Sequence, residues 1–541
     1  MRKRKLLVSS LVISFLLLVT AAIFITKGIN EDRGNKHFIG RKSKEVNGIK
    51  KNKKIPHPKE WGDNEEDLTL KDKRTAYKIQ VSLDEDNKRI LGYERVKLRN
   101  NYSRALKDLV FHLYPDSYNS AETKPSIGGT AKKLSKSEIG DIKINSVTYN
   151  GKKVKYTEDN QILKFKLDKE LKPGEEAEVV IDFTLEIPKS RDRLGYYGDE
   201  YSITNWYPIL SIYDDEKGLW NEKPFHPVGE SNYSDCSDYQ VEILVPEDLI
   251  VVATGVEESK EEKDGMVKVT FKEENVRDFV FFISYDYKVV SKEVNGVKVN
   301  SYYLEHESTA KRMLDLSCKS LEFFSKTYGD YPYSEYDIVE TPLAGGAMEY
   351  PTVIQMGPYR EMDEVPSPNS LVFEDEAVVH ETAHQWFYSI IGSNAFMDPV
   401  LDESFTSYAT ALFFEDLYGE YNKLAVKGAF LAYPYNFEPP IYRSTDQYSW
   451  DDFGVIVYKI GPLVLEDLRR KVGDEKFDQI FKTYYNRYKY KNASLEVFLD
   501  IIKEKAGEQV SEYVRKAFTS KEYSIDAMKL TNEELNKILS N

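Results

Sequence analysis

The stretch that most constrains this chain runs over residues 380–403 and reads HETAHQWFYSIIGSNAFMDPVLDE. His380 and His384 are four residues apart, and the apolar residues around them recur at a helical period. Residues four apart lie on one face of a helix, so both rings can bind one metal ion. The pattern predicts a helix over about 373–391 that presents two imidazole ligands.

A third ligand is offered by Glu403, which follows His384 after eighteen intervening residues. Residues 402–419 read as a second amphipathic helix with Gly419 at its end, and Glu403 would lie in its first turn. Two imidazoles and one carboxylate, with a fourth position left open, are the ligand set of a catalytic zinc site. We therefore expect one Zn²⁺ per chain, held by His380, His384 and Glu403.

Glu381 lies one position round the helix from His380, which makes it a poor third ligand. It can instead act as a general base that takes a proton from a zinc-bound water. The alternative is an ordinary buried helix with two hydrogen-bonded histidines. The chain has only seven histidines, and the carboxylate at position 403 favours the metal site over that alternative.

The motif resembles the signature of the M1 family of zinc aminopeptidases, a branch of the gluzincins. HETAHQWF is similar to the family pattern HExxHQWFG, with Tyr388 at the position of the glycine. LDESF at 401–405 is similar to the family's LNEGF, with Asp402 in place of Asn and Ser404 in place of Gly. The resemblance implies the same three zinc ligands that the spacing predicts.

Two further segments carry the resemblance. The family has a glycine-rich strand, GAMEN or GGMEN, and residues 345–350 read GGAMEY, with Tyr350 in place of Asn. The family's catalytic tyrosine lies in a YEKG-like context, and residues 458–461 read YKIG. The resemblance implies that Tyr458 donates its hydroxyl to the oxyanion of the tetrahedral intermediate.

An enzyme that removes amino-terminal residues must recognise a free ammonium group. A carboxylate near the metal does so by charge-assisted hydrogen bonding, and the resemblance makes Glu349 the candidate. The strand before it would bind the substrate backbone through the residues Gly345, Gly346, Ala347 and Met348. The family often adds a second acidic or amide group from its N-terminal domain. The corresponding region is expected within 201–215, where Asn205 is one candidate.

The amino terminus predicts a membrane anchor. Residues 6–26 carry no charge and are long enough to span a bilayer, and the preceding residues read MRKRK. An uncleaved signal anchor, residues 1–26, is favoured over a cleaved signal peptide because the A-x-A site is poor. The basic amino end favours a single-pass protein of the cell membrane with its catalytic part outside the cytoplasm.

The composition of the rest of the chain limits which molecules the protein can bind. Residues 27–70 are rich in Lys, Asn and Gly and read as a flexible basic tether. Because the amino-terminal part is basic, the body is more acidic than the net charge of −15 for the whole chain. An acidic body excludes nucleic acid as a partner and favours cationic peptides. Cys236 and Cys318 are expected to be free buried thiols, and the oligomeric state is left open.

Two halves of the chain differ in pattern, so a multidomain fold is expected. Residues 71–292 alternate with period two between turn residues, which predicts an antiparallel all-β domain, a sandwich or saddle-like sheet. Residues 293–541 mix strands with helices and become mainly helical after about 452. With the resemblance, this predicts a thermolysin-like α+β catalytic domain. Longer family members carry further domains that close over the active site, and without them the cleft is expected to be more open.

The function expected from the sequence is zinc-dependent removal of amino-terminal residues from peptides. A zinc endopeptidase or oligopeptidase on the same scaffold is the alternative, because Tyr350 replaces the family's Asn beside the amine-binding carboxylate. An inactive peptide-binding scaffold is the third reading, and the complete set of ligands and base argues against it.

Overall fold

The structure is a computed structural model that describes residues 55–61, 68–125, 133–366, 371–419 and 440–521. The anchor predicted over 1–26 and most of the tether predicted over 27–70 lie outside these ranges. Within them, none of the helices combines the length and the apolar character that crossing a bilayer requires.

The amino-terminal half is built from strands, as the period-two alternation predicts. Strand β2, for example, buries every second side chain. The strands are β1 (Ala76–Asp84), β2 (Arg89–Arg99), β3 (Leu106–His112), β4 (Asp141–Tyr149), β5 (Lys152–Lys153), β6 (Tyr156–Asp159), β7 (Ile162–Leu171), β8 (Glu176–Glu186), β9 (Gly195–Tyr197), β10 (Glu200–Ile203), β11 (Ile209–Leu210), β12 (Tyr213–Asp214), β13 (Leu219–Trp220), β14 (Ser237–Pro246), β15 (Ile250–Ala253), β16 (Val256–Lys263), β17 (Met266–Val276) and β18 (Phe281–Ser284).

These strands form one large sheet and smaller ones that share a hydrophobic core with it. The large sheet has eight strands in the order β16-β17-β14-β1-β2-β8-β4-β5. The prediction of a purely antiparallel half was wrong at its centre, where β1 pairs with β14 in parallel. Hairpin neighbours must be antiparallel, but these two strands are far apart in sequence and no hairpin fixes their direction.

The carboxyl-terminal half mixes strands and helices and then becomes helical. Its sheet has five strands in the order β19-β20-β21-β23-β22, and the predicted boundary at residue 292 falls inside its first strand. The elements are β19 (Lys288–Val294), β20 (Val297–Tyr303), α3 (Glu307–Thr327), β21 (Glu335–Glu340), β22 (Ala347–Met348), β23 (Val353–Met356), α4 (Phe373–Ala383), β24 (Ile391–Ser393), α5 (Phe405–Tyr418), α7 (Trp450–Val455), α8 (Gly461–Val472), α9 (Asp474–Tyr488), β25 (Lys491–Ala493), α10 (Leu495–Ala506) and α11 (Glu508–Thr519).

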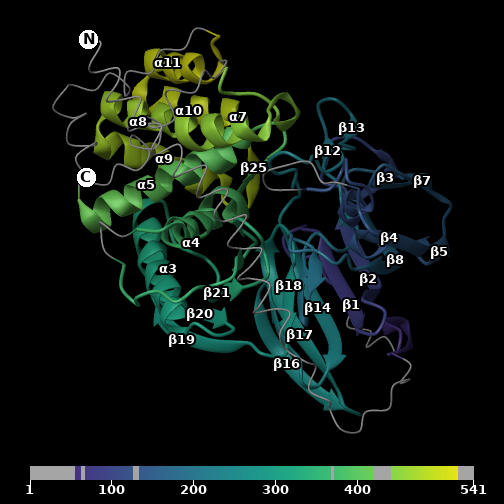
Figure 1. Cartoon of the computed structure of the whole chain (residues 1–541). Coiled ribbons are helices and arrows are strands. Elements are labelled where there is room, and N and C mark those ends of the chain that lie inside the picture. Colours follow the sequence, from purple (N-terminus) through teal and green to yellow (C-terminus); the bar gives the residue numbers. More distant parts are fainter. Residues whose placement is uncertain (1–54, 62–67, 126–132, 367–370, 420–439, 522–541) are drawn as a thin grey trace.

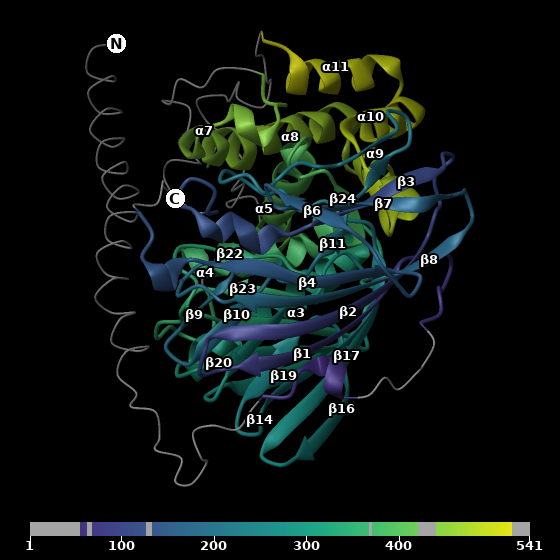
Figure 2. The same ribbon diagram turned by 90° about the vertical axis from the view of Figure 1, so that its right-hand side faces the viewer.

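The two halves lie side by side, and the predicted metal-binding helix α4 is central. Figure 1 shows helices α5 and α7–α11 gathered at one end of the molecule, with the large β sheet at the other. Helix α4 packs against α3 and α5 and lies next to the short edge strand β22, as the side view also shows (Figure 2). The glycine-rich segment and the metal-binding helix, which the sequence separates, are therefore neighbours in space.

Candidate active site

The metal-binding helix is shorter than the sequence predicts. Helix α4 ends at Ala383, and His384 is its C-cap. Beyond it Phe387 (φ −109°, ψ 56°) and Tyr388 (φ 174°, ψ −66°) leave helical geometry, and the amide of Ser389 bonds to the carbonyl of His384 five residues back (3.0 Å). The prediction of one helix over 373–391 was wrong after residue 383, because the side chains there are all buried and their apolar pattern hides the break.

The other two functional positions lie in widened helical turns. Glu403 is in the π turn Val400–Ser404 before α5, and Tyr458 is in the π turn Ile456–Ile460 before α8. Each turn is closed by a hydrogen bond from the amide five residues on. Such turns occur often at functional sites because the extra residue redirects a side chain out of the regular helix.

His380, His384 and Glu403 converge. Nε2 of His380 lies 3.1 Å from Nε2 of His384 and 3.2 Å from Oε2 of Glu403, and the remaining pair, His384 Nε2 to the same oxygen, is 3.4 Å apart. Zinc bonds of about 2.0–2.2 Å to nitrogen and carboxylate oxygen span such separations in tetrahedral geometry. The donor set and its spacing therefore fit zinc, and the three predicted ligands meet at one point.

The second ring nitrogen of His384 is held by oxygens that the sequence analysis did not assign. Its Nδ1 lies 3.1 Å from the carbonyl of Phe387, 3.1 Å from Oγ1 of Thr406 and 3.0 Å from a carboxylate oxygen of Asp402. Three acceptors around Nδ1 require a proton there, which leaves the lone pair on Nε2 for the metal. Asp402, where the family has Asn, is thus part of the site, and its position next to Glu403 was the available signal.

Tyr458 also reaches the triad. Its hydroxyl donates to Oε1 of Glu403 over 2.6 Å, and its ring stacks on His380. A steric constraint explains why the YKIG segment has a glycine at position 461. A Cβ on Gly461 would lie 2.1 Å from Oγ of Ser404, and this hydroxyl in turn bonds to the carbonyl of Val457 (2.6 Å). Only glycine lets the two π turns approach this closely.

Glu381, the predicted general base, is buried next to these ligands. It is 6% exposed, one carboxylate oxygen has no partner among the described residues, and burial raises its pKa well above the ordinary value. The pKa of Glu403 is shifted in the opposite direction. Burial alone would raise its pKa, but hydrogen bonds from His380 and His384 outweigh burial and hold it below the ordinary value. The two neighbouring carboxyls therefore have opposite protonation preferences: Glu381 favours the protonated form and Glu403 the ionised form.

Gln385 of the motif ties the metal-binding segment to the glycine-rich one. Its side-chain oxygen accepts from the amide of Thr352 (3.0 Å), and its side-chain nitrogen donates to the carbonyl of Tyr350 (3.1 Å). Trp386 is core: it is fully buried and donates to the carbonyl of Gly329 (2.8 Å). Gln385 and Trp386 of the signature thus dock the helix against its surroundings.

The glycine-rich segment forms an edge strand. Ala347 and Met348 make up β22, which pairs antiparallel with β23 on one side only. Before it, Gly345 is exposed and has a positive φ of 84°, and Gly346 is half-buried. An edge strand of this kind leaves its other backbone groups available to an extended peptide.

Glu349 follows this strand and is 4% exposed. Single ligand atoms of Glu349, His384 and Asp402 lie within 4.8 Å of one another, so the predicted amine-binding carboxylate stands beside the metal site. Burial raises the pKa of Glu349 to about 7. One of its oxygens has no partner among the described residues, which leaves it free for a ligand.

The N-terminal half contributes a carboxylate that the sequence analysis missed. Glu230 is 6% exposed, forms a buried ion pair with Arg193, and interacts electrostatically with Glu349 and Glu403. Burial raises its pKa to about 8, against the opposing effect of Arg193. Glu230 is therefore a candidate for the expected contribution from this half, and it lies outside 201–215. No motif marks it, because only folding brings it near Glu349 and Glu403.

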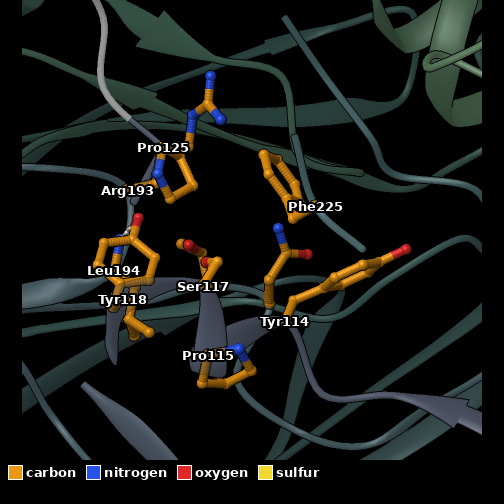
Figure 3. Close-up of a pocket in the computed structure, with 10 residues that line it drawn as sticks. Tyr114, Pro115, Ser117, Tyr118, Pro125, Arg193, Leu194 and Phe225 are labelled. Carbon is orange, nitrogen blue, oxygen red and sulfur yellow. Dashed lines mark hydrogen bonds between the residues drawn. The ribbon is translucent and has the colours of Figure 1, made fainter. Parts of the chain in front are cut away.

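Asn205 lies elsewhere. It has a positive φ of 49° and lines a cavity of about 10 Å³ next to Arg193 and Thr204. Figure 3 shows this cavity between Tyr118 and Phe225, with the guanidinium of Arg193 beyond them. That volume is about the least that a single water needs, so the cavity is no substrate pocket.

Tyr350 points into the core rather than into the cleft. It is 1% exposed and packs with apolar residues of both halves, in the cluster Val252, Val280, Phe282, Tyr287, Leu304, Val339, Leu343, Met348 and Val353. Its electrostatic neighbours include Arg193 and Glu349. The replacement of the family's Asn by Tyr350 therefore changes the core packing next to Glu349 rather than the surface that would face a substrate.

The comparisons with known proteins agree with this geometry. Residues 312–517 match the model of the Peptidase family M1 domain. Aminopeptidase M1-C of Oryza sativa subsp. japonica is 25% identical over 417 residues, which are 70% of this chain and 44% of the rice protein. Aminopeptidase N of Lactococcus lactis subsp. cremoris is 22% identical over 80% of this chain and 53% of its own length. The chain spans about half or less of these curated relatives.

A solved structure shares the fold over most of its length. The M1 zinc metallopeptidase of Deinococcus radiodurans superposes with a TM-score of 0.61 at 18% identity, covering 83% of this chain and 95% of that one. The family match covers the segment that holds α4, the glycine-rich strand and both π turns. Residues 312–517 of this chain are thus a Peptidase family M1 domain.

Proposed function

We propose that the protein is a zinc-dependent aminopeptidase that removes amino-terminal residues from peptides. One observation carries the proposal: the triad His380, His384 and Glu403 lies beside the buried carboxylates Glu349 and Glu230. The first group supports hydrolysis of an amide bond, and the second supports recognition of a free ammonium.

The triad would hold the zinc ion. Bound there, zinc supplies Lewis acidity, which polarises a carbonyl and lowers the pKa of water. Glu381 takes the proton of the attacking water, and its raised pKa suits it to deliver that proton later to the leaving amine. Tyr458 turns its hydroxyl from Glu403 to the oxygen that gains charge in the transition state.

The ammonium group of the substrate would be bound by Glu349 and Glu230. Burial makes both carboxyls reluctant to ionise alone, with pKa values of about 7 and 8. An incoming cation favours the ionised forms, so binding energy is concentrated on substrates with a free amino end. Arg193 holds Glu230 in place and offsets part of the repulsion between the two acids.

The substrate backbone would pair with β22. Gly345 and Gly346, which have no side chains, give it room, and Ala347 and Met348 offer strand hydrogen bonds. The mixed sheet followed by helices also supports a thermolysin-like description of this half. The D. radiodurans relative has been crystallised, as a variant, with a Tyr-Ser-Ala substrate. That observation belongs to the relative and supports peptides as the substrate class to test here.

The test compares free and blocked substrates. An aminoacyl nitroanilide and its N-acetylated form are assayed with the full chain, with and without chelator and added zinc. We expect cleavage of the free form alone, lost with chelator and restored by zinc. In Glu349→Gln, KM for the free form should rise at least tenfold, because one charged partner of the ammonium is removed. Equal rates on both forms would replace this proposal with a zinc endopeptidase.

We propose in addition that residues 6–26 anchor the chain in the cell membrane with the catalytic half outside the cytoplasm. The uncharged length of this segment and the MRKRK sequence before it support the proposal. Fractionation of cells that express the chain with and without residues 1–26 tests it. Recovery of the full chain in the soluble fraction would contradict it.

A further inference from the structure

The irregular turn after the metal-binding helix has a direct link to a zinc ligand. The carbonyl of Phe387 accepts from Nδ1 of His384 (3.1 Å). That carbonyl and the amide of Tyr388 belong to one planar peptide unit. Contacts that hold both the carbonyl and the side chain of Tyr388 therefore also restrain the peptide unit that carries the acceptor of the His384 ring.

Tyr388 is fixed at both ends by consecutive residues of the N-terminal half. Nε of Arg277 donates to the carbonyl of Tyr388 (2.6 Å), and the phenol of Tyr388 donates to Oδ2 of Asp278. Arg277, Asp278 and Tyr388 are 2%, 3% and 5% exposed. Buried charge-assisted hydrogen bonds of this kind are strong, because water does not compete for the partners.

Arg277 also joins the turn to its surroundings. The guanidinium donates to the carbonyl of Ser234 (2.8 Å), to Oδ1 of Asn492 (2.6 Å) and to the carbonyl of Lys491 (2.8 Å). A Cβ on Gly392 would lie 2.1 Å from its central carbon, so the guanidinium fills the space beside β24. Arg277, which anchors Tyr388, is therefore itself held by three further hydrogen bonds.

We propose that Arg277 and Asp278 are positioning residues for the zinc ligand His384, acting through the backbone of Phe387 and Tyr388. The N-terminal β half then sets the affinity for the metal as well as lending a carboxylate to the substrate site. The inference rests on the proposed zinc site. It also gives a partner to Tyr388, which stands where the family signature has glycine: the carboxylate of Asp278.

Zinc affinity tests the proposal directly, without substrate. The dissociation constant is measured by competition with a chromogenic chelator for the wild type, Tyr388→Phe, Asp278→Asn and Arg277→Lys. Outer partners of a metal-binding histidine typically contribute about 10–100-fold in affinity, and we expect roughly tenfold weaker binding in Tyr388→Phe and more in Arg277→Lys. The double variant Tyr388→Phe/Asp278→Asn should be no weaker than the poorer single one, because both lie on one path.

Tyr287→Phe is the matched control. It removes another buried phenol, one that donates to the backbone carbonyl of Glu340 (3.0 Å) and, among the described residues, has no hydrogen bond to residues 384–388. Both phenylalanine variants should lose thermal stability, but only Tyr388→Phe should weaken zinc binding and alter the visible spectrum of the cobalt-substituted protein. Equal zinc affinity and an unchanged spectrum in Tyr388→Phe and Arg277→Lys would overturn the positioning role. A wild type that binds zinc without cutting peptides would overturn the proposed function alone, and one that binds no zinc would overturn both.

Discussion

The hydroxyl of Tyr458 donates a 2.6 Å hydrogen bond to Oε1 of Glu403, whose other oxygen faces both histidines. Before a substrate binds, the hydroxyl of Tyr458 is thus hydrogen-bonded to the predicted zinc ligand Glu403. Tyr458→Phe removes a donor to the oxyanion, and loss of one such donor costs about 10²–10³ in kcat. Steady-state kinetics should show that loss with KM nearly unchanged and zinc content near one per chain. A variant with wild-type kcat would exclude Tyr458 from the transition state.

Glu381→Gln separates metal binding from proton transfer. The amide keeps the size of the side chain but cannot accept the proton of water, and general base catalysis typically contributes about 10²–10⁴. We expect at least that loss in kcat, with zinc affinity within a few-fold of the wild type because Glu381 is not a ligand. Zinc titration and kinetics on the same preparation check both parts. Retained activity would require another base.

Gly461→Ala should be destabilising because its Cβ would fall 2.1 Å from Oγ of Ser404. Overpacking of this kind costs about 1–3 kcal/mol. Ser404→Gly, which restores the residue typical of the family, should rescue most of that loss in the double variant. Gly454→Ala is the control, since no atom lies within 4 Å of a Cβ there. The free energies of unfolding of the four variants, measured with denaturant, check this double-mutant cycle. If the losses of Gly461→Ala and Ser404→Gly add up in the double variant, the contact between the two positions is refuted.

Glu200 should make stability depend on pH. It is 6% exposed, and burial raises its pKa to about 8. Because the folded pKa is raised, the folded state binds the extra proton, and this contribution is complete below the unfolded pKa and lost as pH rises through about 8. Between pH 6 and 9 the melting temperature of the wild type should fall more than that of Glu200→Gln. The exposed Glu262→Gln should follow the wild type, and parallel curves for all three would exclude Glu200 as the source.

The parts of the site that the sequence predicts are those set by local spacing. His380 and His384 share a helix face, and Glu403 begins the next helix, so their convergence follows from two short elements and one loop. Tyr458 and Glu349 are far away in sequence and were found through the segments YKIG and GGAMEY. The alternation of β2 likewise predicted its buried face, since one residue in two must meet the core.

The parts that the sequence does not predict are set by contacts through space. Glu230 and Arg277 lie in the N-terminal half, and nothing in their neighbourhood along the chain shows that folding carries them to the metal-binding segment. The parallel pairing of β1 with β14 is of the same kind, because no hairpin joins them. The break after His384 was missed for another reason: buried apolar residues continue through it, and periodicity reports burial rather than backbone geometry.

The π turns at Val400–Ser404 and Ile456–Ile460 limit which deletions this sequence can accept during evolution. Each contains one residue more than a regular helical turn, and a residue advances an α-helix by about 100°. Deleting that residue would leave α5 or α8 well formed yet turn Glu403 or Tyr458 away from the metal. Single-residue gaps should therefore be excluded from these two turns in active homologues, even where the flanking helices tolerate wide substitution.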